Sequence, residues 1–302
     1  DRYASRGLGD VYKRQDYFTT DELAKFLRIK PRKVYDLISK GNIPHSRVMG
    51  KLLFSKIEIS NWISGTEKSV SEMKNIPNVL LGSHDPLLEL AVKHSKSGIA
   101  MSFDGSIQGI DRFKLNQGIA SGLHIYDHNL KNWNVSLIKS QLKAKQVVLM
   151  EWATRQRGLI FKSTNNNKKK KSFKDFKGKI LVIRQPGSGA DTYLRYLLKN
   201  EDLSYDDYIN SDLAYSENDA VSLILSDQAD VSFGLKSEAN KFDLEFIPIV
   251  TERFDLIVYR KYWFENPFQA LLNFSKTKDF LKLASSFEGY NIDNLGKIHF
   301  NS

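Results

Sequence analysis

The chain has 302 residues, a formal net charge of +10 and no cysteine. The missing thiols exclude disulfides, thiolate zinc sites and cysteine nucleophiles, while the positive charge permits binding to nucleic acid. No apolar stretch approaches the length of a membrane span, and the start of the chain lacks the apolar core of a secretion signal. We therefore expect a cytoplasmic protein that is long enough for two domains.

The first stretch, residues 1–15, follows neither helical nor strand periodicity. It resembles translated sequencing-adapter read-through, so we leave it out of the predicted fold. The alternative is a disordered native arm.

Two short helices joined by a tight turn are predicted at the start of the first domain, residues 16–64. Thr19 and Glu22 have the spacing of a capping box, and an apolar helical face follows them. Pro31 stands at the first position of the second helix, and Gly41 is placed as its C-terminal cap. Two helices this close predict helix-turn-helix geometry.

A small hairpin and a third helix are predicted next. Residues 43–48 and 51–54 flank a short turn at 49–50, which is typical of a β-hairpin. Ser55 and Glu58 then repeat the capping-box spacing ahead of another apolar helical pattern. A hairpin placed after two such helices would form the wing of a winged helix-turn-helix.

Positive charge is concentrated in this domain, with nine Lys or Arg and one acid between residues 25 and 56. On the second helix, the side opposite Val34 and Leu37 carries residues that can hydrogen-bond base edges or phosphates, and the hairpin adds cations that would reach the backbone. The predicted DNA-binding residues are Arg32, Lys33, Tyr35, Ser39, Lys40, Arg47 and Lys51. The alternative is a merely solvated basic face.

The stretch TTDELAKFLRIKPRKVYDLISKGNIPHSRVMGKLLFSKIEISNWI resembles the winged helix-turn-helix of the excisionase and MerR-like families over its whole length. The resemblance implies binding to double-stranded DNA. That family often has Ser or Thr just before the second helix, where this chain has Lys30.

A polar linker is predicted at residues 65–76, followed by a larger domain at 77–302. Short apolar runs alternate there with helical patterns, which predicts parallel βα units of an α/β fold. We expect two lobes, the first at about 77–160 and 259–302 and the second at about 173–246.

Three segments of this domain receive specific interpretations. Residues 147–161 read as a pair of strands that crosses between the lobes. Residues 120–122 are interpreted as a turn before a strand at 123–126. The lysine-rich run Asn165 to Lys171 is expected to be a solvated loop.

Glycine or serine turns lie where strands meet helices, the place at which α/β sheets bind ligands. Ser83 and Ser106 follow the first two strands of the domain, and Ser188 lies between a strand at 180–183 and an amphipathic helix. Helix N-termini favour anions, so we expect these serines to converge from both lobes on one cleft that holds a small oxyanion or carboxylate. The alternative for the Ser188 turn is an ordinary helix cap.

The segments GSHDPLLELA, DGSIQGI, WATRQRGLIF, IRQPGSGADTYLRYLL and DQADVSFGL resemble the periplasmic-binding-protein-like domain that is found fused to helix-turn-helix regulators. The resemblance implies a two-lobed type II α/β domain, similar in fold to molybdate and tungstate binding proteins. A frequent form of the family has Thr-Arg after the GSG turn, where this chain has Ala190 and Asp191, and an unpaired carboxylate there would disfavour an anion. The ligand-binding residues predicted from the turns and the resemblance are Ser83, His84, Gly105, Ser106, Arg155, Arg184, Ser188 and Gly189.

The sharp enzyme motifs, namely the P-loop, GxSxG, HExxH and CxxC, do not occur in the sequence. His124, Asp127 and His128 invite a metal site, but their placement on a strand and its loop argues against one, and we expect no metal and no cofactor. The prediction is a prokaryotic one-component transcriptional regulator that binds DNA and senses a small anionic ligand such as molybdate or tungstate, without a membrane partner. A homodimer, a transferase on the same fold and a DNA-architectural protein with an assembly domain stay open as alternatives.

Overall fold

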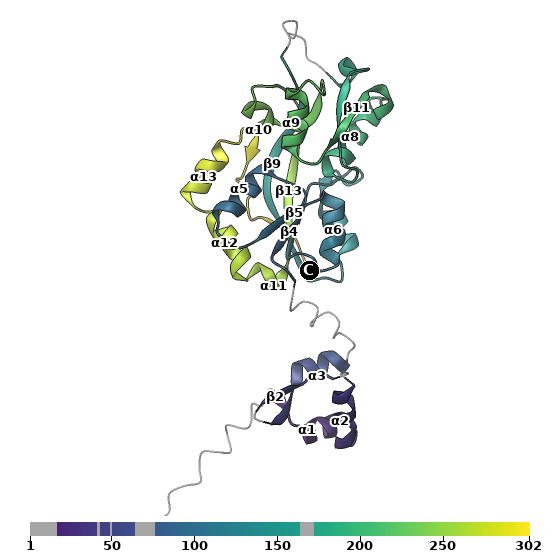
Figure 1. Cartoon of the computed structure of the whole chain (residues 1–302), viewed down its shortest axis with the longest axis vertical. Helices are drawn as coiled ribbons and strands as arrows, with labels where there is room; N and C mark the ends of the chain where they lie inside the picture. The colour runs from purple at the N-terminus through teal and green to yellow at the C-terminus, as the bar shows by residue number, and fades with distance from the viewer. Residues whose placement is uncertain (1–16, 41–42, 49, 64–75, 164–171) are drawn as a thin grey trace, which may run out of the picture. The chain divides into compact units, whose positions relative to one another are not determined.

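The computed structural model describes residues 17–40, 43–48, 50–63, 76–163 and 172–302. The chain divides into two units, Asp1–Asn75 and Ile76–Ser302, which are described separately (Figure 1). Among the described residues, no helix is both long and apolar enough to cross a lipid bilayer. The predictions for residues 1–15, Gly41, the turn residue Met49, the linker as far as Asn75 and the loop Asn165 to Lys171 lie outside the described residues.

The first unit has the predicted order of helix, turn, helix and wing. Its elements are β1 (Tyr17–Phe18), α1 (Thr20–Phe26), α2 (Pro31–Ser39), β2 (Ser46–Val48), β3 (Lys51–Ser55) and α3 (Lys56–Ile63). The capping box is present at α1, where the Glu22 amide donates to Thr19 Oγ1 and the Thr19 amide donates to Glu22 Oε2. The strands β2 and β3 pair as an antiparallel hairpin, so the structure confirms the winged helix-turn-helix.

The chain reverses direction in the short turn between α1 and α2. Arg28 adopts a positive φ of 55°, and the Ile29 amide donates to the Ala24 carbonyl at 2.9 Å, which closes the end of α1. The helices then meet over an apolar core that includes Leu23, Val34 and the β3 residue Phe54. Burial of these side chains fixes α2 with its opposite, polar side exposed.

The second unit is a mixed α/β domain. Its strands are β4 (Val79–Gly82), β5 (Ala100–Phe103), β6 (Ala120–Leu123), β7 (Tyr126–Asp127), β8 (Asn132–Trp133), β9 (Val147–Phe161), β10 (Ile180–Arg184), β11 (Ile209–Ala214), β12 (Ser232–Leu235), β13 (Glu245–Tyr259), β14 (Tyr290–Asn291) and β15 (Ile298–Asn301). Its helices are α5 (Pro86–His94), α6 (Ser106–Lys114), α7 (Val135–Gln141), α8 (Gly189–Asn200), α9 (Glu217–Leu225), α10 (Lys236–Lys241), α11 (Arg260–Trp263), α12 (Asn266–Phe274) and α13 (Lys278–Ser285), with 3-10 turns η3 (Phe173–Phe176) and η4 (Tyr205–Asp207).

One large sheet runs through both lobes in the order β12-β9-β13-β6-β4-β5. In the first lobe β4 pairs in parallel with β5 and β6, and β13 joins β6 antiparallel. The strands β9 and β13 are each 15 residues long and pair antiparallel over their whole length, so both pass from one lobe to the other (Figure 1). The structure therefore confirms the two-lobed α/β fold.

Helices cover both sides of the strands in the second lobe. Leu159 and Phe161 of β9 pack in a cluster with the α8 residue Leu194, whereas Ile160 between them packs with the α9 residue Ile224. This alternation follows from the period of two along a strand and buries β9 on both of its faces.

The interpretation of residues 147–161 as a strand pair is wrong, because the segment forms the single strand β9. Arg155 and Arg157 fall between two apolar runs and do not interrupt the strand, since buried carboxylates pair with both guanidinium groups. An unpaired charge would be too costly to bury at this place.

The turn predicted at residues 120–122 is also wrong, because these residues form β6 together with Leu123. Their small side chains instead allow α6 to approach the sheet. A Cβ on Gly109 of α6 would lie 2.2 Å from the Cα of Gly82 and 2.7 Å from Ser121 Oγ, which no folded backbone tolerates. Residues 120–122 are therefore small because α6 packs closely against them, and not because they form a turn.

Candidate functional site

Two of the predicted serines meet at the carboxyl ends of neighbouring strands. Ser83 follows β4 and Ser106 begins α6 after β5, and both are buried. Their Oγ atoms lie 2.7 Å apart, and Ser106 Oγ also accepts a hydrogen bond from the His124 amide at 3.2 Å. Parallel pairing of β4 with β5 and β6 brings these three strand ends to one edge of the sheet.

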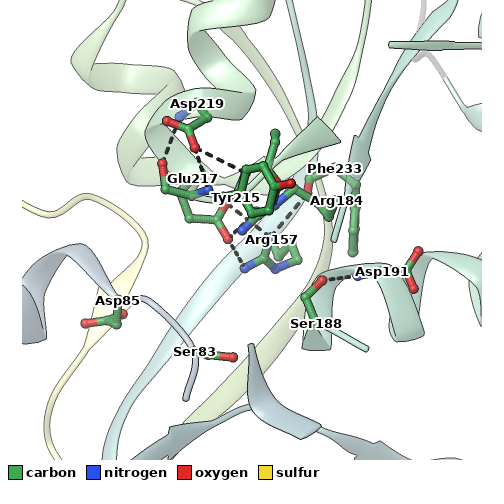
Figure 2. Close-up of polar contacts among 12 residues, drawn as sticks. Ser83, Asp85, Arg157, Arg184, Ser188, Asp191, Tyr215, Glu217, Asp219 and Phe233 are labelled. Atoms are coloured by element: carbon green, nitrogen blue, oxygen red, sulfur yellow. Dashed lines mark hydrogen bonds and ion pairs between the residues drawn. The ribbon is translucent and has the colours of Figure 1, made fainter. Parts of the chain in front are cut away.

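The turn before α8 brings the third predicted serine, from the second lobe, against the start of α6. Ser188 caps α8 by accepting a hydrogen bond from the Asp191 amide at 3.1 Å. Its Cα lies 3.5 Å from the position that a Cβ on Gly105 would take. The Gln108 side chain donates to the Pro186 carbonyl at 2.9 Å, which also links α6 to this turn. The structure thus brings all three serine turns together, and Figure 2 shows Ser83 and Ser188 on separate elements.

A second close approach between the lobes involves Gly189 and His124. A Cβ on Gly189 would lie only 2.4 Å from the His124 carbonyl oxygen, so this position requires glycine in the observed packing. The His124 ring pairs with Glu252, with 3.0 Å between Nδ1 and Oε2. Burial lowers the pKa of His124 below its ordinary value although Glu252 raises it, so the ring is neutral near pH 7.

Behind the serines, six buried charged side chains form one chain of ion pairs of alternating sign. Their order is Asp85, Arg155, Glu252, Arg157, Glu217 and Arg184, joined by N–O distances of 2.6, 2.7, 2.9, 2.9 and 2.9 Å. Asp85 also caps α5 in the first lobe, and Arg184 ends β10 in the second. Figure 2 shows Arg157 and Arg184 near Glu217 at the start of α9. The chain of ion pairs therefore connects the two lobes.

This ion-pair chain is electrically balanced. Burial raises the pKa of Glu252, but the charges of Arg155 and Arg157 outweigh burial and hold it well below its ordinary value. The pKa of Glu217 is lowered likewise, because Arg157 and Arg184 outweigh the effect of burial. Three arginines thus alternate with three carboxylates beside a neutral His124, and the formal charges sum to zero.

Both arginines predicted to bind a ligand are engaged by carboxylates of the protein itself. Arg184 pairs with Glu217, and Arg155 pairs with Asp85 and Glu252. Arg155 Nη2 has no hydrogen-bond partner among the described residues and remains a possible donor to a ligand. His84 turns to α5, where its Nε2 lies 2.8 Å from Glu89 Oε2.

Sequence reasoning missed Glu252, Glu217 and Arg157 as members of this site. The available signal was two arginines within a long apolar run, because buried cations require carboxylate partners somewhere in the fold. It did not indicate which of the acids of the chain supply them.

Asp191, whose carboxylate would disfavour an anion if unpaired, is paired with a cation in the structure. Arg195 Nε lies 3.1 Å from both Asp191 oxygens, and the Tyr205 hydroxyl donates to Oδ1 at 2.9 Å. Its charge is therefore compensated on α8 and η4.

In the first unit, the seven residues predicted to bind DNA are all exposed. Val34 of α2 is fully buried, so this helix turns its basic side outward. Lys30 stands at the N-cap of α2 without a side-chain hydrogen bond to the first turn, and Pro31 occupies the first helical position. The amides of that turn therefore have no side-chain cap.

Residues 87–276 match the PBP superfamily domain, and residues 17–66 match a helix-turn-helix domain. The chain therefore belongs to the PBP superfamily, the class of the periplasmic binding proteins, and carries a helix-turn-helix domain ahead of the binding domain. The fusion predicted from sequence is confirmed. The helix-turn-helix suggests DNA binding, and the PBP domain suggests ligand binding.

The chain is 27% identical over 302 residues to the uncharacterized protein YvgK of Bacillus subtilis (strain 168), covering 93% of this chain and 97% of that protein. An ABC transporter substrate-binding protein with bound phosphate from Clostridium perfringens has a TM-score of 0.50 and 14% identity, over 72% of this chain and 98% of the other. A tungstate ABC transporter structure from Geobacter sulfurreducens has a TM-score of 0.47 and 11% identity, over 69% and 97%. The likeness to the phosphate-bound protein concerns the fold alone.

Proposed function

We propose that this protein is a one-component transcriptional regulator, in which the winged helix-turn-helix binds double-stranded DNA and the two-lobed domain senses a small anion. The proposal depends above all on the meeting of Ser83 and Ser106, 2.7 Å apart, with the turn of Ser188 from the other lobe. As a DNA-binding regulator it would act in the cytoplasm.

Hydrogen-bond donors, and not net positive charge, would hold the anion. The formal charges of the ion-pair chain sum to zero, so the chain as a whole attracts an added anion only weakly. Serine hydroxyls, Arg155 Nη2 and the first turn of α6 can donate to oxygen; that turn has no side-chain cap, although its Ile107 amide already donates to the Gly187 carbonyl at 3.4 Å. A tetrahedral oxyanion such as phosphate, sulfate, molybdate or tungstate can accept several such bonds at once.

DNA would contact the exposed side of α2 and the wing. The uncapped first turn of α2 and the side chain of Arg32 suit phosphates, whereas Tyr35 and Ser39 can reach base edges. Arg47 and Lys51 of the hairpin would add backbone contacts.

Binding of the anion would stabilise contact between the lobes and so change the affinity of the first unit for DNA. Such coupling typically amounts to about 1–3 kcal/mol, which is roughly a 5- to 150-fold change in DNA affinity. No covalent chemistry is part of this mechanism.

The test is calorimetric titration of the full chain with phosphate, sulfate, molybdate and tungstate. We expect at least one to bind. The double variant Ser83→Ala with Ser106→Ala should weaken that binding by about ten- to a hundredfold, because one hydroxyl proton of the pair lies between the two serines and the other supplies one hydrogen bond to a charged group, about 1.5–3 kcal/mol. Ser275→Ala, a buried serine that donates to the Leu272 carbonyl, is the matched control. Absence of binding by all four anions, or unchanged binding by the double variant, would reject the proposal.

A further inference from the structure

Away from the three serines, a pocket between the lobes is lined by residues of α5 and of the end of α13 and the segment after it in the first lobe, and by residues of α10 in the second. Figure 1 labels these three helices. Its volume is about 360 Å³. This is near the lower end of the range of roughly 300–1,000 Å³ that is typical of small-molecule sites. None of the three serines described above lines it.

Glu238 of α10 supplies a buried carboxylate to this pocket. Its side chain is only 4% exposed, and among the described residues its one ion pair is with Lys241, at 3.9 Å. Lys241 is 59% exposed, so water screens this contact and the pair is weak. Burial raises the pKa of Glu238, although Lys241 opposes this shift, which is the behaviour of a carboxylate that lacks a close counter-ion.

The other carboxylate that lines the pocket, Glu89 of α5, is already paired. It contacts His84 at 2.8 Å and Lys93 at 2.5 Å. Glu238 is therefore the lining carboxylate that is available to pair with a cation bound in the pocket.

Ser237 adds a second polar group to the lining of the pocket. It is 7% exposed and lines the pocket beside Glu238, yet its Oγ has no hydrogen-bond partner among the described residues. A buried hydroxyl without a partner is unfavourable, so a ligand that donates to this oxygen would stabilise the protein.

The remaining lining residues are the apolar Pro86, Leu90, Leu283 and Phe287, together with Ser286 and the exposed Lys241. We propose that this pocket binds a small aliphatic primary amine as its ammonium ion. The ammonium group donates to the Glu238 carboxylate and to Ser237 Oγ, and the alkyl chain packs against these apolar residues.

The position of the pocket gives such binding a consequence for the lobes. Its walls come from α5 and α13 on one side and from α10 on the other, and Lys236 of α10 already pairs with Glu288 of the first lobe at 2.7 Å along this edge. An amine held between these helices stabilises the contact between the lobes. This effect is separate from that of the anion proposed at the serines.

The experiment is calorimetric titration of the full chain with n-butylammonium chloride at constant ionic strength, compared with n-butanol. We expect the ammonium ion to bind at least tenfold more tightly than the alcohol. Glu238→Gln, which keeps the shape and removes the charge, should weaken ammonium binding at least tenfold, and Ser237→Ala should weaken it severalfold. Glu245→Gln, which neutralises an exposed glutamate of the same lobe, is the control and should bind as the unmodified chain does.

Equal binding of alcohol and ammonium would overturn the proposal, because it would show an apolar pocket without charge recognition. Equal ammonium affinity in the Glu238→Gln and Glu245→Gln variants would overturn it as well. Both results are independent of anion binding at the serines, which the Glu238→Gln variant should retain.

Discussion

Replacing Glu252 with glutamine tests the role of the buried ion-pair chain. Glu252 is paired with Arg155 at 2.7 Å, with Arg157 at 2.9 Å and with the His124 ring at 3.0 Å. Glutamine keeps nearly the same volume but removes the negative charge. Three buried arginines would then face two carboxylates.

We expect this substitution to lower the free energy of unfolding of the second unit by about 3–5 kcal/mol, the usual effect of removing one partner from a buried pair. Urea denaturation at pH 7, followed by tryptophan fluorescence, measures the loss as a lower midpoint with an unchanged slope. Glu245→Gln is a matched control, because it makes the same change on the same strand at an exposed position. It should alter stability by less than about 0.5 kcal/mol.

The pH dependence provides a second readout. The folded-state pKa of Glu252 lies well below its ordinary value of 4.5, so its contribution is fully present above that value and is lost as pH falls through the folded pKa. The difference in stability between the unmodified chain and Glu252→Gln should therefore be constant from pH 7 to pH 5 and shrink below about pH 4.5. A loss under about 1 kcal/mol at pH 7, or a difference that grows in acid, would refute this account of the chain.

Two further predictions concern the DNA surface and the packing of α6. Arg32→Ala with Lys33→Ala should weaken binding to duplex DNA and reduce the slope of log K against log salt by about 2, since each phosphate contact contributes about 0.9. Fluorescence anisotropy measures both the affinity and the slope, with Lys199→Ala of the second unit as the control. An unchanged slope would show that these two residues do not contact DNA phosphates. Gly109→Ala should destabilise the second unit by about 1–3 kcal/mol, because its Cβ would collide with Gly82. Replacing an ordinary helical glycine with alanine stabilises a protein, so a higher melting temperature of the Gly109→Ala variant would contradict the packing argument.

Features with local signals were predictable from the sequence. The capping box at Thr19 and Glu22 and the start of the second helix at Pro31 depend on residues that are neighbours in the chain, and both are found as predicted. The serine turns were also accessible, because the carboxyl ends of parallel strands meet at one edge of a sheet. Their role in binding remains a prediction.

The ion-pair chain could not be predicted because it is made by residues far apart in sequence. Arg157 and Glu252 are separated by 95 residues, and Arg157 and Glu217 by 60. Only the register of β13 against β9 brings Glu252 opposite Arg155, and that register depends on both long strands. The turn predicted at residues 120–122 was wrong for a related reason, since only the contact of β6 with α6 explains the small side chains.

Two kinds of contact would respond differently to a bend of β9 and β13, the strands that pass through both lobes. Arg155, Arg157 and Glu252 are carried by β9 and β13 themselves, so a bend of these strands changes their mutual spacing little. The contacts of Gly105 with Ser188 and of Gly189 with His124 lie between different elements and would be lost at once. Movement of the lobes would thus preserve the pairs that Glu252 makes with Arg155 and Arg157, whereas the outer pairs with Asp85 and Glu217 would respond to the position of the lobes, as the contacts at the serine turns do. A small solute that stabilises one set of these outer contacts would therefore favour one arrangement of the lobes.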